Sequence, residues 1–173
     1  MFPSVKNPER ITARLKNLEQ QVYVCVTTDD VGKNKLGTKT RNLDLLSDPE
    51  LEFTLYFFTS AEANNTKMVL PVHESTKCCL SMSPEKNLEL TTLREGDSSS
   101  NEVDTLEDPN KITQADSRFF YVKSSGTNIA LEAMNGTDAN YYLAVSEKNQ
   151  VVIEESTDSN YPENILFSLD TFQ

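Results

Sequence analysis

The amino-acid sequence is poor in the residues on which most enzymes and nucleic-acid-binding proteins depend. It contains no tryptophan and one histidine, and 16 basic residues face 27 acidic ones, for a formal net charge of −11. Nucleic acids, anionic membrane surfaces and heparin-like polyanions all bind to basic faces, so this composition argues against each of them as a partner. The lack of tryptophan also removes the usual side chain that stacks on sugars.

Recognisable catalytic motifs are missing as well. The one histidine, His73, ends a predicted edge strand and is expected at the surface. The sequence has no Gly-x-Ser-x-Gly motif and no glycine-rich phosphate loop, and the carboxylates between positions 97 and 108 do not follow the spacing of a calcium-binding EF-hand. We therefore expect no enzymatic activity, no cofactor and no metal ion.

The three cysteines, Cys25, Cys78 and Cys79, are odd in number and form no Cys-x-x-Cys pair. Neighbouring residues on a strand point to opposite faces of a sheet, so Cys78 and Cys79 are not placed to bridge each other. This predicts three free thiols in a chain made in a reducing compartment.

The first residues contain no apolar segment typical of a signal peptide, and no apolar run approaches membrane length, so we expect synthesis in the cytosol.

Hydrophobic and polar residues alternate over short runs, most clearly between positions 119 and 145. Ile129, Leu131 and Ala133 alternate with their neighbours, and a period of two places one set of side chains on one face of a sheet. Gly126 and Asn135-Gly136 supply the positive backbone angles that tight turns require. The chain divides into about twelve such runs, which predicts an all-β protein.

We assign residues 10–173 to one domain and residues 1–9, which contain Pro3 and Pro8, to a flexible lead-in. Residues 95–116 are rich in serine and acidic residues and are expected to form a long solvated loop. Pro71 predicts that its strand lies at an edge or carries a bulge. Three similar runs, at residues 22–26, 78–82 and 141–145, each stand second in a group of four predicted strands, which favours a threefold organisation.

Residues 11–22 are ambiguous between a helix and a strand. Helical spacing relates the apolar residues Ile11, Leu15, Leu18 and Val22. Alternation typical of a strand relates Ile11, Ala13 and Leu15. The local pattern alone slightly favours the helix.

Several of these motifs, in their order and spacing, resemble the interleukin-1 family of cytokines. The first two matching segments are an aromatic pair, Phe119-Phe120, and a strand ending in Leu-Glu, Ile129-Ala130-Leu131-Glu132. The other two are an aromatic-aromatic-aliphatic-Ala run, Tyr141-Tyr142-Leu143-Ala144, and a closing strand at residues 163–169. The closing strand is similar to that of the interleukin-33 branch. Residues 15–23 resemble the first hairpin of the interleukin-36 and interleukin-18 branches, and on that ground we expect strands at residues 11–17 and 22–26 in place of the helix.

The resemblance implies a β-trefoil, in which twelve short strands form three four-strand units around a six-stranded barrel. It further implies a monomeric cytokine that leaves the cell by an unconventional route and acts outside it in inflammatory and immune signalling. Its partners would be an immunoglobulin-domain ectodomain of the interleukin-1 receptor family and the accessory chain of that receptor. The alternatives are an antagonist of the same family, which binds without recruiting the accessory chain, and a non-cytokine β-trefoil binding module.

The family's receptor-facing segments correspond by position to the first strand, the turn at residues 33–35, the loop at residues 42–50 and the last hairpin loop at residues 157–163. The resemblance implies that the receptor contacts are Arg10, Arg14, Lys33, Asn34, Lys35, Asp158, Asn160 and Tyr161. Tyr161 is favoured among them because it is a large amphipathic side chain in a loop.

Overall fold

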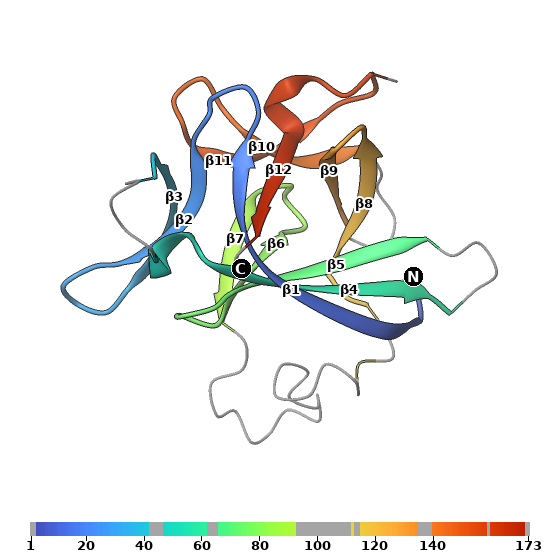
Figure 1. Cartoon of the computed structure of the whole chain (residues 1–173), viewed down its shortest axis with the longest axis horizontal. Helices are drawn as coiled ribbons and strands as arrows, with labels where there is room; N and C mark the ends of the chain where they lie inside the picture. The colour runs from blue at the N-terminus through green and yellow to red at the C-terminus, as the bar shows by residue number, and fades with distance from the viewer. Residues whose placement is uncertain are drawn as a thin grey trace.

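The computed structural model describes residues 3–41, 47–61, 66–92, 112, 115–134, 140–158 and 160–171, and this part of the chain is built mainly from β-strands (Figure 1). The strands are β1 (Val5–Asn17), β2 (Tyr23–Thr28), β3 (Asn34–Lys39), β4 (Phe53–Ser60), β5 (Lys67–His73), β6 (Cys78–Met82), β7 (Leu88–Thr92), β8 (Phe120–Ser125), β9 (Asn128–Ala133), β10 (Tyr141–Val145), β11 (Val151–Glu155) and β12 (Leu166–Thr171). Single-turn 3₁₀ helices occur at η1 (Pro49–Leu51) and η3 (Glu163–Ile165). Within these ranges there is no helix with the length and apolarity needed to cross a membrane.

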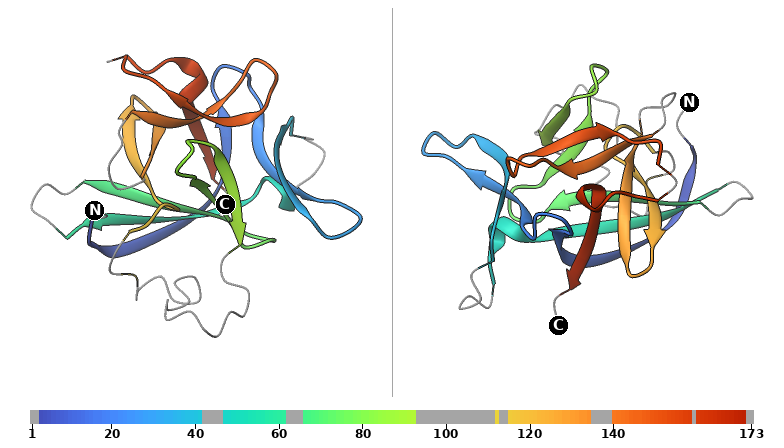
Figure 2. Two further views of the ribbon diagram at one scale, coloured as in Figure 1. Left: turned by 180° about the vertical axis from the view of Figure 1, so that it is seen from behind. Right: turned by 90° about the horizontal axis from the view of Figure 1, so that it is seen from above.

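Six strands form a closed barrel in which every strand pairs antiparallel with two neighbours. The order around the ring is β1, β4, β5, β8, β9 and β12, and pairing of β12 with β1 closes it. The remaining described strands pair as the hairpins β2–β3, β6–β7 and β10–β11. β3, β7 and β11 also contact one another, so the three hairpins meet (Figure 2). The prediction of an all-β protein is confirmed.

One apolar core is shared by the barrel and the hairpins. Phe53 of β4, Phe120 of β8 and Phe167 of β12 are fully buried in it. The hairpin strands add aliphatic side chains to the same cluster, namely Val24, Val26, Leu80, Met82, Leu143 and Val145. The burial of these side chains ties each hairpin to the barrel, because leaving them exposed to water is unfavourable.

Residues 11–22, ambiguous in the sequence, form the second half of β1 and the turn that leads to β2. β1 lies between two strands, with Ile11 opposite Leu55 of β4 and Leu15 opposite Leu169 of β12. Backbone pairing along both edges stabilises the extended chain and outweighs the helical spacing of the apolar residues. The expectation of strands here is confirmed, and the local helical pattern was misleading.

β1 begins at Val5, inside the segment expected to be a flexible lead-in, so that boundary is corrected. Val5 lies opposite Ser60 of β4 and is 4% exposed. Its side chain belongs to a second apolar cluster that includes Phe58 and Met68. The first residues of β1 are therefore part of the folded domain.

A bulge allows β1 to continue through Pro8. The register between β1 and β4 shifts between Lys6 and Glu9, and Asn7 has a positive φ of 56°. Asparagine tolerates this conformation better than most residues. Proline has no backbone N–H to donate, and in a bulge no hydrogen bond to the neighbouring strand is required of it. The proline interrupts the pairing without ending the strand.

Pro71 lies in β5, which is paired on both sides, so of the two expected alternatives, an edge strand or a bulge, the edge strand was wrong. On one side Pro71 is opposite Leu55 of β4. On the other side β5 pairs with β8 at Met68 and Val69, and with β6 at Val72. Pro71 thus falls where β5 changes partner, a point at which a missing backbone N–H is tolerated.

The acidic segment at residues 95–116 lies outside the described residues except for Ile112, Ala115 and Asp116. Ile112 and Ala115 are buried in the cluster that contains Val5. The backbone N–H of Ala115 donates to the carbonyl of Pro3 at 3.0 Å. The end of this segment therefore packs against the start of β1, which the expectation of a solvated loop did not foresee.

We predict that Val5→Ala destabilises the protein by about 1–3 kcal/mol, because it removes about two buried methyl groups and leaves a cavity. Urea unfolding followed by circular dichroism measures the change. The matched control is Lys6→Ala at an exposed neighbouring position, which should change stability by less than about 0.5 kcal/mol. Equal stability of Val5→Ala and the wild type would show that β1 starts later in solution.

Candidate functional site

The turn between β2 and β3, residues 29–33, is closed by hydrogen bonds centred on Asp29. Asp29 N donates to Lys33 O at 2.9 Å, and Gly32 N donates to Asp29 O at 3.0 Å. Asp29 Oδ1 accepts from Val31 N at 3.0 Å and from Lys33 N at 2.8 Å. Gly32 supplies the positive φ of 84° that the turn needs. Lys33, and Lys35 in β3, are exposed beside it, as predicted for receptor contacts.

Asn34 has a positioning role in this hairpin. Its Oδ1 accepts a hydrogen bond from Thr28 Oγ1 at 2.7 Å, which joins β3 to β2 across the base of the turn. Its Nδ2 donates to Cys78 Sγ at 3.3 Å, which joins the hairpin to the start of β6. The side chain that was expected to contact a receptor is thus engaged within the chain.

The two arginines of β1 differ in exposure. Arg10, opposite Tyr56 of β4, is exposed, as expected for a binding residue. Arg14, directly opposite Asp170 of β12, is 4% exposed. Arg14 therefore does not present its side chain at the surface, and the expectation of a surface contact is corrected.

The connection from β11 to η3 carries the third group of predicted contacts. Asp158 and Asn160 are exposed. Tyr161 is half-buried, and its ring meets that of Tyr142 edge-on, with 5.8 Å between the ring centroids. Tyr161 packs against a small apolar cluster of β9, β10 and η3 residues, so much of its ring is committed to the fold.

The predicted contacts do not form one patch. The β2–β3 turn projects from one side of the barrel, whereas the connection that leads to β12 lies at the top of Figure 1, and the two remain apart in the other views (Figure 2). The predicted loop at residues 42–50 is described only from Ser47 onward, and residues 42–46 lie outside the described part of the chain.

A polar cleft of about 550 Å³ lies where the β1–β2 turn, the β10–β11 turn and the η3 region come together. Its lining consists of Glu19, Val145, Ser146, Glu147, Lys148, Gln150, Glu154 and Asn164. Asn164 holds one wall, since its Nδ2 donates to Glu154 Oε2 at 2.5 Å and its carbonyl accepts from Asn17 Nδ2 at 2.9 Å. The sequence analysis missed this cleft because its residues come from segments far apart in the chain.

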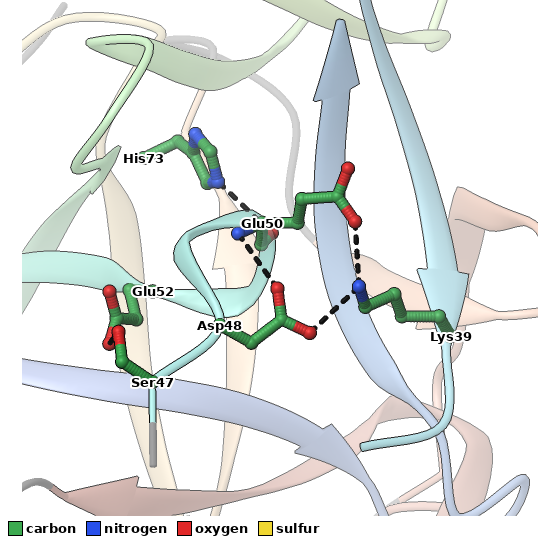
Figure 3. Close-up of polar contacts among 6 residues, drawn as sticks. All are labelled: Lys39, Ser47, Asp48, Glu50, Glu52 and His73. Carbon is green, nitrogen blue, oxygen red and sulfur yellow. Dashed lines mark hydrogen bonds and ion pairs between the residues drawn. The ribbon is translucent and has the colours of Figure 1, made fainter. Parts of the chain in front are cut away.

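A partly buried polar cluster joins β3, η1 and the end of β5 (Figure 3). Lys39 Nζ lies 2.7 Å from Asp48 Oδ2 and 2.6 Å from Glu50 Oε1. Asp48 Oδ1 accepts from Glu50 N at 3.2 Å and so caps η1. Lys39 donates hydrogen bonds to both carboxylates, and this raises the pKa of Lys39. These contacts hold the turn that precedes β4.

His73 belongs to this cluster and is fully buried, which corrects the expectation of a surface histidine. Its Nε2 lies 3.0 Å from the carbonyl of Glu50, to which it donates, and its Nδ1 lies 2.7 Å from Thr76 Oγ1, from which it accepts in the neutral ring. Burial lowers the pKa of His73 from 6.5, although the nearby Glu50 and Glu52 act in the opposite direction. The ring is thus a neutral bridge between η1 and β5.

Cys25, Cys78 and Cys79 are free thiols and buried. Burial raises the pKa of Cys25, and it raises the pKa of Cys79 to about 12, so neither is a reactive thiolate near neutral pH. Over the ranges that the structure describes, no group of three or more His, Cys, Asp or Glu side chains is placed to hold a metal ion.

No protein-family model matches this sequence, and no curated protein sequence matches it. Solved structures do resemble the fold. The GlcNAcα1-4Gal releasing endo-β-galactosidase from Clostridium perfringens aligns with a TM-score of 0.60 at 7% identity, over 94% of this chain and 33% of the enzyme, so the chain spans about a third of that protein. BEL beta-trefoil aligns with a TM-score of 0.58 at 11% identity, over 94% of this chain and 93% of that one.

A Caenorhabditis elegans protein, described as having unknown function, aligns with a TM-score of 0.59 at 11% identity, over 96% of both chains. At these identities the likeness concerns the fold alone. The closed barrel and the BEL structure together define the class of this protein, which is an all-β protein with the fold of a β-trefoil.

We predict that His73 makes stability depend on pH in weakly acidic solution. The unfolded chain takes up the imidazole proton at higher pH than the folded chain. The contribution of the neutral His73 ring to the free energy of unfolding is therefore complete above pH 6.5 and declines as the pH falls below it. The slope from one proton is at most about 1.4 kcal/mol per pH unit. His73→Gln, which keeps a donor for Glu50 O, should reduce the slope of unfolding free energy between about pH 6.5 and 5.

Urea unfolding at several pH values measures this slope, and subtraction of the variant from the wild type removes the contribution of the carboxylates common to both. Parallel pH profiles for the two proteins would contradict a neutral, buried His73.

Proposed function

We propose that this chain is a cytokine of the interleukin-1 family type, with three four-strand units, that binds an immunoglobulin-domain receptor ectodomain. The proposal rests first on the resemblance of its sequence motifs, which occupy β-strands of the barrel and hairpins. The second residue of the aromatic pair is the first residue of β8. The Leu-Glu strand lies in β9, and the aromatic-aromatic-aliphatic-Ala run lies in β10.

The pairing inside the barrel supports the division into three units. Taking β1–β4, β5–β8 and β9–β12 as the units, the first and fourth strands of each pair in the barrel and the second and third form its hairpin. In every unit a buried phenylalanine of the fourth strand lies opposite an aliphatic residue of the first. The pairs are Ala13 with Phe53, Val69 with Phe120 and Ile129 with Phe167. Equivalent residues in equivalent places are what a threefold repeat produces.

The exposed and ordered β2–β3 turn is the observation that best supports receptor binding. Lys33 and Lys35 extend from a hydrogen-bonded turn on a chain whose net charge is −11. Binding loops held by a rigid scaffold lose little conformational entropy on association. On this proposal the protein acts by binding alone, outside the cell, either as an agonist that also recruits an accessory chain or as an antagonist that does not.

The test is surface plasmon resonance with a panel of interleukin-1 receptor family ectodomains. We expect one ectodomain to bind, and expect Lys33→Ala combined with Lys35→Ala to slow association about 3- to 10-fold, since charges at the rim of an interface act mainly on the association rate. Lys67→Ala, at the exposed first residue of β5 and outside the polar cleft, is the matched control. Failure of the whole panel to bind would remove the proposal, and a signalling reporter with and without the accessory chain separates agonist from antagonist.

The polar cleft favours a second candidate, a β-trefoil module that binds a small hydroxyl-rich ligand. Its amide, hydroxyl, carboxylate and ammonium groups can donate and accept several hydrogen bonds at once. Under this candidate a glycan array detects a ligand, and Gln150→Ala together with Glu147→Gln weakens its binding about 10-fold or more. Glu85→Gln, on the exposed β6–β7 turn, is the control, and an array without any bound glycan would rule out a saccharide ligand.

A further inference from the structure

Val31, at the end of the β2–β3 hairpin, is the exposed large hydrophobic side chain of the described chain, with 87% of its surface accessible. Every other large hydrophobic residue that the structure describes is buried or partly buried. The hairpin carries it away from the barrel, and the projection is visible from all three directions (Figures 1 and 2). Val31 is therefore available to a partner without any rearrangement of the core.

The turn that carries Val31 is ordered by its own hydrogen bonds. Asp29 Oδ1 accepts from the backbone N–H of Val31 itself, at 3.0 Å, and from that of Lys33, at 2.8 Å. The hydrogen bond from Lys33 N–H is the largest cause that holds the pKa of Asp29 below its usual value. At the base of the turn, Asn34 joins Thr28 to Cys78. The position of Val31 is thus set before any partner binds.

Two lysines accompany Val31 at this tip. Lys33 and Lys35 are exposed, and neither forms an ion pair with a carboxylate in the part of the chain that the structure describes. Asp29 directs its carboxylate to the backbone of the turn, whereas the two ammonium groups are available to a partner. A partner with acidic groups near its pocket would complement them.

We propose that Val31 is an apolar anchor that enters a pocket on the receptor-type partner, and that carboxylates at the rim of this pocket meet Lys33 and Lys35. The inference rests on the proposed function and specifies which part of the chain docks and what chemistry receives it. Anchors of this kind are effective when they are pre-ordered and become fully desolvated in the complex. Val31 was not among the residues expected from the sequence.

The test measures the affinity of Val31 variants for the ectodomain that binds the wild-type chain. Val31→Ala removes about two methyl groups from the interface, and Val31→Thr keeps the shape but replaces one methyl group by a hydroxyl, so each should weaken binding about 10-fold. Val31→Ile should bind within about 3-fold of the wild type, because it keeps the β-branched apolar surface. Asp29→Ala should also weaken binding with Val31 intact, because it removes the acceptor that orders the turn.

Stability separates loss of contact from loss of fold. Since the Val31 side chain is 87% exposed, Val31→Ala and Val31→Thr should unfold at the wild-type urea midpoint. If an ectodomain binds Val31→Ala and Val31→Thr as tightly as the wild type, the anchor is refuted while the proposed function stands. If no ectodomain binds the wild-type chain, the proposed function fails and the anchor fails with it. Self-association of the wild type that Val31→Ala abolishes, seen by sedimentation velocity, would assign Val31 to a second copy and overturn the proposal.

Discussion

Closure of the barrel by the two ends of the chain is the constraint on which the rest of the structure depends. β1 pairs with β12 over its second half and with β4 along its other edge. An open sheet of six strands would leave two edges of unpaired backbone N–H and C=O groups, and closing the ring satisfies both. The ring also encloses the space that Phe53, Phe120 and Phe167 fill, so hydrogen bonding and hydrophobic burial depend on the same closure.

Because the hairpins share the core with the barrel, their turns are held at defined places on its outside. Apolar side chains point into the core, and polar side chains lie in the turns, where they form hydrogen bonds with nearby groups. Asp29 closes the β2–β3 turn, Asp48 caps η1, and Asn164 joins η3 to β11. The result is a barrel that carries several hydrogen-bonded turns on its outside.

The residues chosen as receptor contacts divide by what the fold requires of them. Arg14 and Tyr161 are drawn into packing by the strands and aromatic rings beside them, and Asn34 links two strands to β6. Lys33 and Lys35 remain at the surface because the turn is closed by backbone groups and by Asp29, without help from the lysines. The segment in which a residue lies is therefore a weak guide to its exposure, since side chains of the same segment can also hold the fold together.

The sequence by itself determined the all-β class, the approximate strand positions and the turns, because period-two alternation and Gly or Asn at turns are local properties of the chain. It did not determine that β1 starts at Val5, that His73 is buried or that the cleft exists. Each of these depends on partners distant in sequence: β4 for Val5, η1 for His73, and three separate regions of the chain for the cleft. Contacts of this kind are decided only when the barrel closes, because closure chooses which segments become neighbours.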